Sequence, residues 1–466
     1  MYKKMLAQDT LLYGIGRVMV NVVSFLLLPL YTRVLGKEGY GMLSLFLTLG
    51  NLLIVFFRWG LPSAYTRFYF EVEENQKDKL YSTIFWGIIL LNIPLIIGIY
   101  AFRHTISAFL LKDPSLGYLV CVVTLTTYLS AIHHLPYAWY QTVRQPTKYV
   151  IYRILHSSLI VVGNVLALFY FKLGVKGILY ANLAVNSLFI LIWVHMYIPA
   201  LKGTIAPQIL KGALKFGIPL VFVSLAQWAL SMTDKIFLVR YTTIAEVGLY
   251  SFGTKIGSII QLGLIGPFVV AWTPIMFRIA KEKNNMQLYK ETLLYWGGIL
   301  ITCASIIAIF SREITTTMGG VDFLPALPVI ILTLAGSVFF GLYQFFVYGP
   351  SVEKKTHILA SLTIIAAILN VCLNFIMVPL WGKIGAALSS LASYLVMCTM
   401  LSLRTSIKKQ IPLLPISIVG GLIVLLALPA LWFVIDNLNL WIKLPIALIT
   451  ILVLLPIYIR AFRSSL

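Results

Sequence analysis

Charged residues are scarce in this sequence. They make up 11% of the 466 residues, whereas a soluble domain carries about 25%. Acidic residues are the rarest of them, with 15 Asp and Glu against 36 Lys and Arg. The longest polar connection, RFYFEVEENQKDKL at 67–80, is too short to hold a domain. These shortages exclude an ordinary soluble protein and leave no room for a separate catalytic domain.

Cysteine is rare as well. Four cysteines lie inside apolar runs, without any CxxC pair or Cys–His spacing: Cys121, Cys303, Cys372 and Cys398. The sequence therefore predicts neither a disulfide framework nor a metal site. We expect these cysteines to be small packing residues, and we expect no metal, no cofactor and no catalytic residue.

Long apolar runs make up most of the chain. Hydrophobic residues account for 60% of it, and the runs reach about 20 residues, the length that crosses ~30 Å of hydrocarbon as a helix. The pattern predicts an all-α polytopic membrane protein with about fourteen spans. They are 11–32, 41–66, 81–102, 116–139, 149–171, 177–199, 214–239, 247–274, 290–311, 323–349, 357–380, 384–403, 411–434 and 442–459.

The two ends of the chain are expected in the cytoplasm. The first residues are basic and then apolar without a signal-peptide cleavage site, which favours an uncleaved first span. With this end inside, the inner connections hold more than twice as many Lys and Arg as the outer ones, as the positive-inside rule requires. The net charge of +21 then belongs to loops beside anionic lipid. It does not indicate a nucleic-acid partner.

The sequence contains an internal duplication. YTRVLGKEGYGMLSLF (31–46) matches LVRYTTIAEVGLYSFG (238–253) at Arg, Gly and Ser positions, all with an offset of 207 residues. LGVKGILYANLA (173–184) matches WGKIGAALSSLA (381–392) with an offset of 208. We therefore predict two parallel six-helix lobes, 1–203 and 204–405, followed by a transmembrane hairpin at 406–466. Repeats of this kind often face each other across a transport cavity.

Few charges fall within the spans. Four cations and one clear acid do so: Arg17, Arg58, Lys235, Lys255 and Asp234. A charge at the bilayer centre costs about 2.5–3.5 kcal/mol on insertion scales, so such residues usually face a cavity or a partner. Because cations outnumber the acid, we predict that the four cations bind an anionic substrate such as a phosphate or pyrophosphate.

Polar side chains extend these positions into stripes along four helices. Spans 1 and 2 contribute Arg17, Asn21, Ser24, Ser44, Thr48, Asn51 and Arg58. Spans 7 and 8 contribute Ser224, Gln227, Ser231, Asp234, Lys235, Ser251, Thr254, Lys255, Ser258 and Gln261. We predict that the stripes line a cavity. Two plainer interpretations stay open: Ser, Thr and Asn can join helices to one another, and Arg17 and Lys235 lie near span ends from which they could snorkel.

Three stretches resemble a known family. LKFGIPLVFVSLAQWALSMTDKIFLVRY with EVGLYSFGTKIG resembles the start of the second lobe in polysaccharide flippases of the multidrug/oligosaccharidyl-lipid/polysaccharide exporter superfamily. LLPLYTRVLGKEGYGMLSLF resembles the matching part of the first lobe, and ILNVCLNFIMVPLWGKIGAALSS resembles the turn between spans 11 and 12. The resemblance covers nearly the whole chain.

The resemblance implies a function. The protein would move an undecaprenyl-pyrophosphate-linked oligosaccharide across the cytoplasmic membrane by alternating access, with spans 1, 2, 7 and 8 around the cavity. The implied partners are this substrate, membrane lipid and a glycan polymerase or glycosyltransferase, and the chain would act as a monomer. In the similar lipid II flippases the last two helices form a groove for the lipid tail, a role that 411–459 could fill.

Two alternatives remain. A cation-coupled multidrug exporter of the same superfamily would need acids deep in its lobes, and this chain offers only Asp234. A membrane-embedded glycosyl- or acyltransferase would need catalytic groups, for which AIHHLPYAWYQTVRQP (131–146) is the best candidate. His133 and His134 in that stretch have no acid nearby in the sequence.

Overall fold

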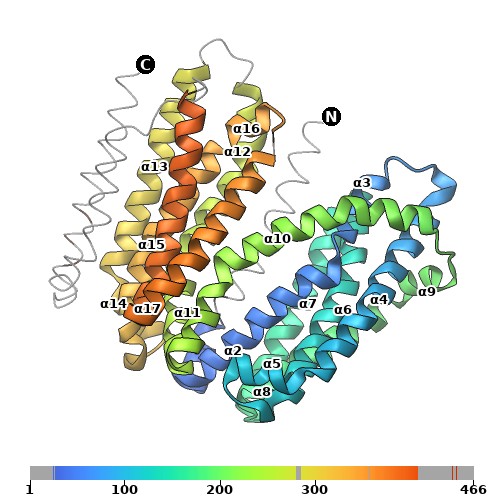
Figure 1. Ribbon diagram of the computed structural model, residues 1–466, viewed down its shortest axis with the longest axis horizontal. Coiled ribbons are helices and arrows are strands. Elements are labelled where there is room, and N and C mark those ends of the chain that lie inside the picture. Colours follow the sequence, from blue (N-terminus) through green and yellow to red (C-terminus); the bar gives the residue numbers. More distant parts are fainter. Residues whose placement is uncertain are drawn as a thin grey trace. The chain divides into compact units, whose positions relative to one another are not determined.

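The computed structural model describes residues 25, 27–279, 285–355, 357–407, 443, 445 and 448. Helices make up nearly all of this part of the chain, and no strand occurs in it (Figure 1). The all-α fold predicted from the apolar runs is therefore confirmed. Ten of the described helical stretches are long and apolar enough to cross a membrane.

The chain divides into two compact units, 1–228 and 229–466, with the boundary inside one long helix. The helices of the first unit are α2 (Leu28–Arg58), α3 (Leu61–Phe68), α4 (Lys77–Ala101), α5 (Arg103–Leu111), α6 (Gly117–Thr142), α7 (Pro146–Val165), the π-helix η3 (Leu166–Tyr170), α8 (Gly174–Ile192) and α9 (Val194–Lys202), besides the short 3₁₀ helices η1 (Glu74–Gln76) and η2 (Pro114–Leu116). The predicted lobe boundaries at 203 and 405 remain predictions.

The boundary helix and the second unit complete the described chain. The helices are α10 (Pro207–Tyr241), α11 (Ile244–Gly257), the π-helix η4 (Gln261–Ile265), α12 (Gly266–Ile279), α13 (Asn285–Ile309), α14 (Ser311–Met318), the 3₁₀ helix η5 (Val321–Ala326), α15 (Leu327–Phe346), α16 (Tyr348–Val352) and α17 (His357–Ile407). Predicted spans 2 to 12 all have counterparts here. Most of span 1 and nearly all of spans 13 and 14 lie outside the described residues.

Two pairs of predicted spans are less separate than the sequence indicated. Helical structure continues from 357 to 407 through a kink at Gly382, where φ is 53°. In the same way α2 contains a kink at Gly36, where φ is 63°. Glycine adopts positive φ without the steric penalty of a Cβ atom. Each turn can therefore be made by a single residue, and no loop is needed between the helices.

The predicted duplication is visible in what equivalent glycines do. Gly174 and Gly382, which match in the repeat, both have positive φ. Gly177 and Gly385, which also match, both lie close to residues that precede them: an added Cβ would lie 2.7 Å from the Leu173 Cβ at Gly177 and 2.1 Å from the Met377 carbonyl oxygen at Gly385. Such close approach requires glycine. The same use of glycine at a turn thus occurs once in each unit.

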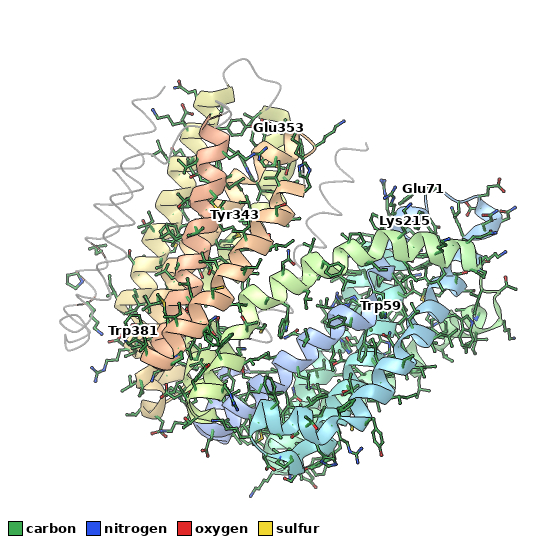
Figure 2. All side chains as sticks on the ribbon, viewed as in Figure 1. Trp59, Glu71, Lys215, Tyr343, Glu353 and Trp381 are labelled. Carbon is green, nitrogen blue, oxygen red and sulfur yellow. The ribbon has the colours of Figure 1, made fainter. Side chains whose placement is uncertain are left out.

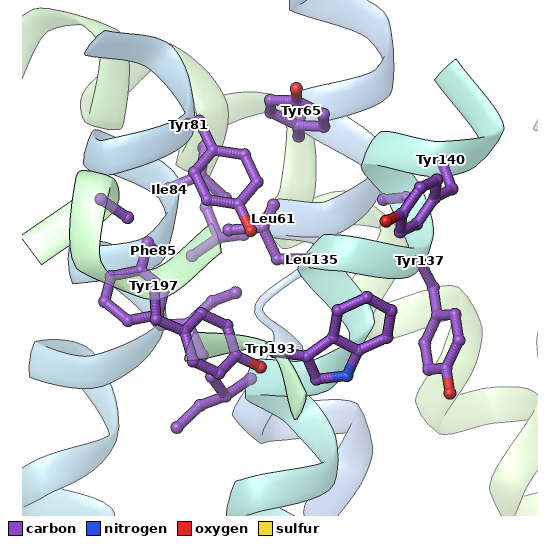
Figure 3. Close-up of a cluster of buried hydrophobic side chains, with 14 of the residues drawn as sticks. Leu61, Tyr65, Tyr81, Ile84, Phe85, Leu135, Tyr137, Tyr140, Trp193 and Tyr197 are labelled. Carbon is purple, nitrogen blue, oxygen red and sulfur yellow. The ribbon is translucent and has the colours of Figure 1, made fainter. Parts of the chain in front are cut away.

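Each unit packs around its fourth predicted span. In the first unit α6 contacts α2, α4, α7 and α8, and in the second α15 contacts α11, α13 and α17. The core of the first unit is rich in aromatic residues, with Trp193 edge-on to Tyr137 at 5.5 Å between ring centroids (Figure 3). The helix α15 carries no charged residue and is buried along most of its length.

Apolar side chains also cover much of the outer surface. Ile97, Phe375 and Leu380 are among many large apolar residues that are more than half exposed. This surface would be unfavourable in water but suits hydrocarbon, where helices satisfy their own backbone groups. Trp381 and Glu353 lie near opposite ends of the second unit (Figure 2), as expected if its helices cross a bilayer. The protein is a multi-pass membrane protein.

Candidate functional site

The predicted site residues divide between the two units. Arg17, Asn21 and Ser24 lie outside the described residues. The stripe of span 2 belongs to α2 in the first unit, and that of span 8 to α11 and the following turn in the second. The stripe of span 7 follows α10, which crosses the boundary between the units. The contacts within each unit show what these residues do.

The end of α2 is fixed by a buried asparagine. Asn92 on α4 donates to the carbonyl of Phe57 at 2.8 Å, and its own side-chain oxygen accepts from Trp59 Nε1 at 3.0 Å. The carbonyl of Phe57 belongs to the last turn of α2, where intrahelical donors run out. A polar residue of an apolar span thus stabilises the helix end on which Arg58 lies.

Arg58 is held against the C-terminal third of α6. Its Nη2 donates to His134 Nε2, and its Nε is buried without a hydrogen-bond partner among the residues that the structure describes. Arg153 on α7 packs its guanidinium over the ring of Tyr137, 4.5 Å from the centroid, and is close enough to interact electrostatically with Arg58. The first unit therefore gathers two arginines and a histidine, and no carboxylate pairs with them in the described part of the chain.

The rest of the α2 stripe is mostly internal to the first unit. Ser44 and Thr48 are buried, and the Thr48 hydroxyl donates to the Ser44 carbonyl at 2.8 Å. Such backbone-directed bonds satisfy a hydroxyl within an apolar helix. Asn51 is exposed. Within this stripe, Asn51 and Arg58 thus keep surface through which they can meet a solute.

Asp234 lies in the interior of the second unit. It is 1% exposed. Its carboxylate accepts from Tyr250 of α11, from Asn374 Nδ2 at 2.5 Å and from the Ser390 hydroxyl at 2.6 Å, the last two on α17. Asn370 extends this network, accepting from Asn374 at 3.0 Å and from Thr233 at 3.2 Å.

The network gives the buried acid hydrogen-bond donors in place of a cation. Three donors from two helices satisfy both oxygens of the carboxylate, which would otherwise be costly to bury. Asp234 therefore joins α10 to α11 and α17 through hydrogen bonds. The sequence predicts Asp234 at the edge of the polar stripe, and in the structure its side chain points into this network.

Lys235 and Lys255, the predicted site lysines of the second unit, are only half-buried. Lys235 Nζ lies 3.8 Å from the sulfur of Met232, and it is close enough to Asp234 and Lys255 to be attracted by the first and repelled by the second. No ion pair joins either lysine to a carboxylate among the residues that the structure describes. Two cations near each other without a carboxylate in salt-bridge contact favour an anion as the missing partner.

The remaining polar residues contact either their own helix or a neighbour. Thr254 and Ser258 donate to carbonyls three residues earlier, and Gln261 donates to the Ser337 hydroxyl on α15 at 2.9 Å. Ser251 is buried, Ser224 is half-buried, and Gln227 and Ser231 are exposed. Some members of each stripe thus join helices, and others keep exposed surface.

The sequence prediction misses the partners of these charges. His134, Arg153, Asn370, Asn374 and Ser390 are not among the predicted site residues. Asn370 and Asn374, four residues apart in an apolar run, form a polar pair that periodicity could detect. His134 stands out in the sequence only as a candidate catalytic group, because nothing there places it beside Arg58.

The donor set does not resemble a metal centre. Among the described residues there is no group of three or more His, Cys, Asp or Glu side chains that could hold a metal ion. Within each unit the predicted site residues and their neighbours offer cations, hydroxyls and amides, and the first unit adds imidazoles. They are suited to binding an anionic or hydroxyl-rich solute.

Comparison with known proteins identifies the family. Residues 6–280 match the family described as polysaccharide biosynthesis proteins. The chain is 24% identical over 403 residues to Lsg locus putative protein 1 of Haemophilus influenzae, covering 81% of this chain and 94% of that protein. It is 22% identical over 241 residues to the succinoglycan biosynthesis transport protein ExoT of Rhizobium meliloti, covering 51% and 47%.

Solved structures share the fold. The structure titled lipid II flippase MurJ, inward closed conformation, superposes with a TM-score of 0.75 at 18% identity over 98% of both chains. An inward-facing multidrug resistance MATE family transporter of the MOP superfamily gives 0.69 at 16% identity, covering 85% of this chain and 99% of that one. The chain belongs to the polysaccharide biosynthesis protein family.

Proposed function

We propose that this protein is a flippase that moves an undecaprenyl-pyrophosphate-linked oligosaccharide across the cytoplasmic membrane for cell-surface polysaccharide synthesis, by alternating access. One observation carries the proposal. Arg58 in the first unit, and Lys235 and Lys255 in the second, have no carboxylate in salt-bridge contact within the described part of the chain.

The charge balance favours an anionic substrate. The acid that lies within these spans, Asp234, is already satisfied by hydroxyl and amide donors. Each cation at membrane depth is unfavourable by about 2.5–3.5 kcal/mol on insertion scales. A pyrophosphate offers several acceptor oxygens and opposite charge, and it forms short, strong hydrogen bonds with guanidinium and ammonium groups. Arg17, from the first span, would join these three cations.

The polar residues that keep exposed surface would contact the glycan. Asn51, Gln227 and Ser231 are exposed on α2 and α10, and their amide and hydroxyl groups can both donate and accept. The prenyl chain would stay in lipid. We further propose that both termini lie in the cytoplasm, that the chain acts as a monomer, and that a glycan polymerase or glycosyltransferase supplies or uses its substrate.

A second candidate is a cation-coupled multidrug exporter. The likeness to the MATE transporter fold favours it. Export of cationic drugs calls for accessible carboxylates, whereas Asp234 is buried and hydrogen-bonded. An assay that offers both kinds of substrate separates the two functions.

The test uses the full-length protein in liposomes with a fluorescent prenyl-pyrophosphate-linked oligosaccharide. Transbilayer movement is measured as protection from a quencher or glycosidase added outside. The triple variant Arg17→Gln, Arg58→Gln and Lys255→Gln should abolish movement, because the pyrophosphate loses three charge-assisted partners. A matched control removes three exposed cations instead.

The control triple is Lys79→Gln, Lys172→Gln and Lys176→Gln, all exposed positions. It changes net charge by the same amount and should leave movement near wild type. Equal movement by both triples would disprove the assigned cations. Efflux of a cationic dye without movement of any lipid-linked sugar would favour the multidrug exporter.

A further inference from the structure

The first unit contains a group of basic side chains around His134. The charged or titratable groups that face it come from three helices: Arg58 from α2, His133 and Tyr137 from α6, and Arg153 and His156 from α7. No aspartate or glutamate pairs with any of them in the described ranges. The group is thus positive or neutral throughout.

The contact between Arg58 and His134 fixes the protonation of the histidine. Arginine has only N–H donors and keeps its charge in proteins. His134 Nε2 must therefore accept the hydrogen bond with its lone pair, which places the ring proton on Nδ1. A protonated imidazole has donors on both nitrogens and cannot make this contact.

The neighbouring histidines are in different situations. His133 Nδ1 lies 2.8 Å from the Tyr197 hydroxyl and Nε2 lies 2.8 Å from the Asn186 carbonyl, so both nitrogens are occupied. The His156 ring packs edge-on against Phe189 at 4.5 Å and interacts with the Asn186 side chain. Of the three, His134 is the histidine hydrogen-bonded to an arginine.

Protonation of His134 would change what this group can bind. The added proton, taken from water, would break the Arg58 hydrogen bond and place a third positive charge beside Arg58 and Arg153. Like charges this close repel strongly in a low-dielectric setting. A phosphate group between Arg58 and His134 would accept from both side chains.

From this geometry we propose that binding of a phosphate-bearing anion at Arg58 is coupled to uptake of one proton by His134. The inference rests on the proposed function, because it assigns Arg58 to the pyrophosphate of the substrate. His134 is then a positioning residue: in its neutral form it holds Arg58, and in its protonated form it becomes a second donor to the anion. Proton concentration would thereby influence substrate binding and release.

Linkage sets the size of the effect. If anion binding draws one proton onto His134, then each unit fall in pH tightens binding about tenfold in the range where the free protein is unprotonated. The coupling is reciprocal, so the bound anion stabilises the protonated histidine by the same factor. A histidine that only packs against Arg58 would give no such slope.

The experiment is calorimetric titration of the purified full-length protein with inorganic pyrophosphate, free of divalent metal, between pH 7 and 8.5. Repeating each titration in two buffers of different ionisation enthalpy gives the number of protons taken up. The variants are His134→Gln, whose amide can still accept from Arg58 without titrating, and His195→Gln, which alters an exposed histidine of α9. Pyrophosphate titrates as well, but equally for all variants.

Wild type and His195→Gln should take up roughly one proton more than His134→Gln. Their affinity should also rise about tenfold per pH unit relative to His134→Gln. Equal proton uptake and equal pH slopes in wild type and His134→Gln would overturn the inference. If His134→Gln does not fold, Arg58→Gln serves instead, and it should lose both affinity and the extra proton.

The liposome assay separates this inference from the proposed function. Wild type that moves the lipid-linked sugar but binds pyrophosphate without extra proton uptake would refute the coupling alone. Wild type that neither moves the sugar nor binds pyrophosphate would refute both. Movement that accelerates with an imposed pH difference, and loses that response in His134→Gln, would support the coupling.

Discussion

The buried network around Asp234 offers a sharp test of how the second unit is held together. The perturbation is Asp234→Ala, compared with the isosteric Asp234→Asn. Alanine removes the acceptor of three hydrogen bonds, from Tyr250, Asn374 and Ser390. Asparagine keeps one oxygen in place and replaces the other with a donor.

The expected loss in the free energy of unfolding follows from the hydrogen-bond donors that are left without an acceptor. A buried polar group left without a partner costs about 1–3 kcal/mol, so three donors set a range of about 3–9 kcal/mol for alanine. Asn374 keeps its bond to Asn370, which places the value near the lower end, at about 4 kcal/mol. Hydroxyls can rotate to accept from an amide, so asparagine should cost only about 1–2 kcal/mol.

The assay is thermal unfolding of the purified protein in detergent. At 2–4 °C per kcal/mol, a loss of about 4 kcal/mol lowers the unfolding temperature by roughly 8–16 °C for alanine, and asparagine should fall between it and wild type. Asp322→Ala, which removes an exposed acid from the same unit, is the control and should change little. An unchanged unfolding temperature for Asp234→Ala would show that the network does not stabilise the unit.

Two further predictions use the same assay. Gly217→Ala should destabilise the first unit by about 1–3 kcal/mol, because the added Cβ would lie 2.2 Å from the Trp59 carbonyl oxygen. The control Gly98→Ala, whose added Cβ has nothing within 4 Å, should be neutral or stabilising. A larger loss of stability for Gly98→Ala than for Gly217→Ala would contradict this packing. Glu313→Gln should lower the free energy of unfolding by about 3–5 kcal/mol, because it leaves the buried ammonium of Lys443 without its charged partner. Lys443 is 1% exposed, and its Nζ lies 2.8 Å from Glu313 Oε1. Lys443→Met should cost less, since Glu313 is 34% exposed and can turn to water, and equal losses would refute the argument.

The sequence alone determined the class of fold, the family and the repeat. Long apolar runs predict membrane-spanning helices, because in lipid each span must satisfy its own backbone hydrogen-bonding groups. Hydropathy is therefore enough to place spans 2 to 12 along the chain. The matches around Gly174 and Gly382 can be found because identical turns need the same residue, glycine, at the same place in each repeat.

Tertiary structure alone decided what the charges contact. Periodicity indicates that Thr48 and Arg58 share one side of α2, but not that Thr48 is buried and Arg58 is held by His134. Likewise Asp234 meets Asn374 across 140 residues of sequence. A span's hydropathy depends only on its own residues, so it can be read locally. Hydrogen bonds between helices depend on which helices pack together and in which rotation, and that is settled only when the whole unit folds.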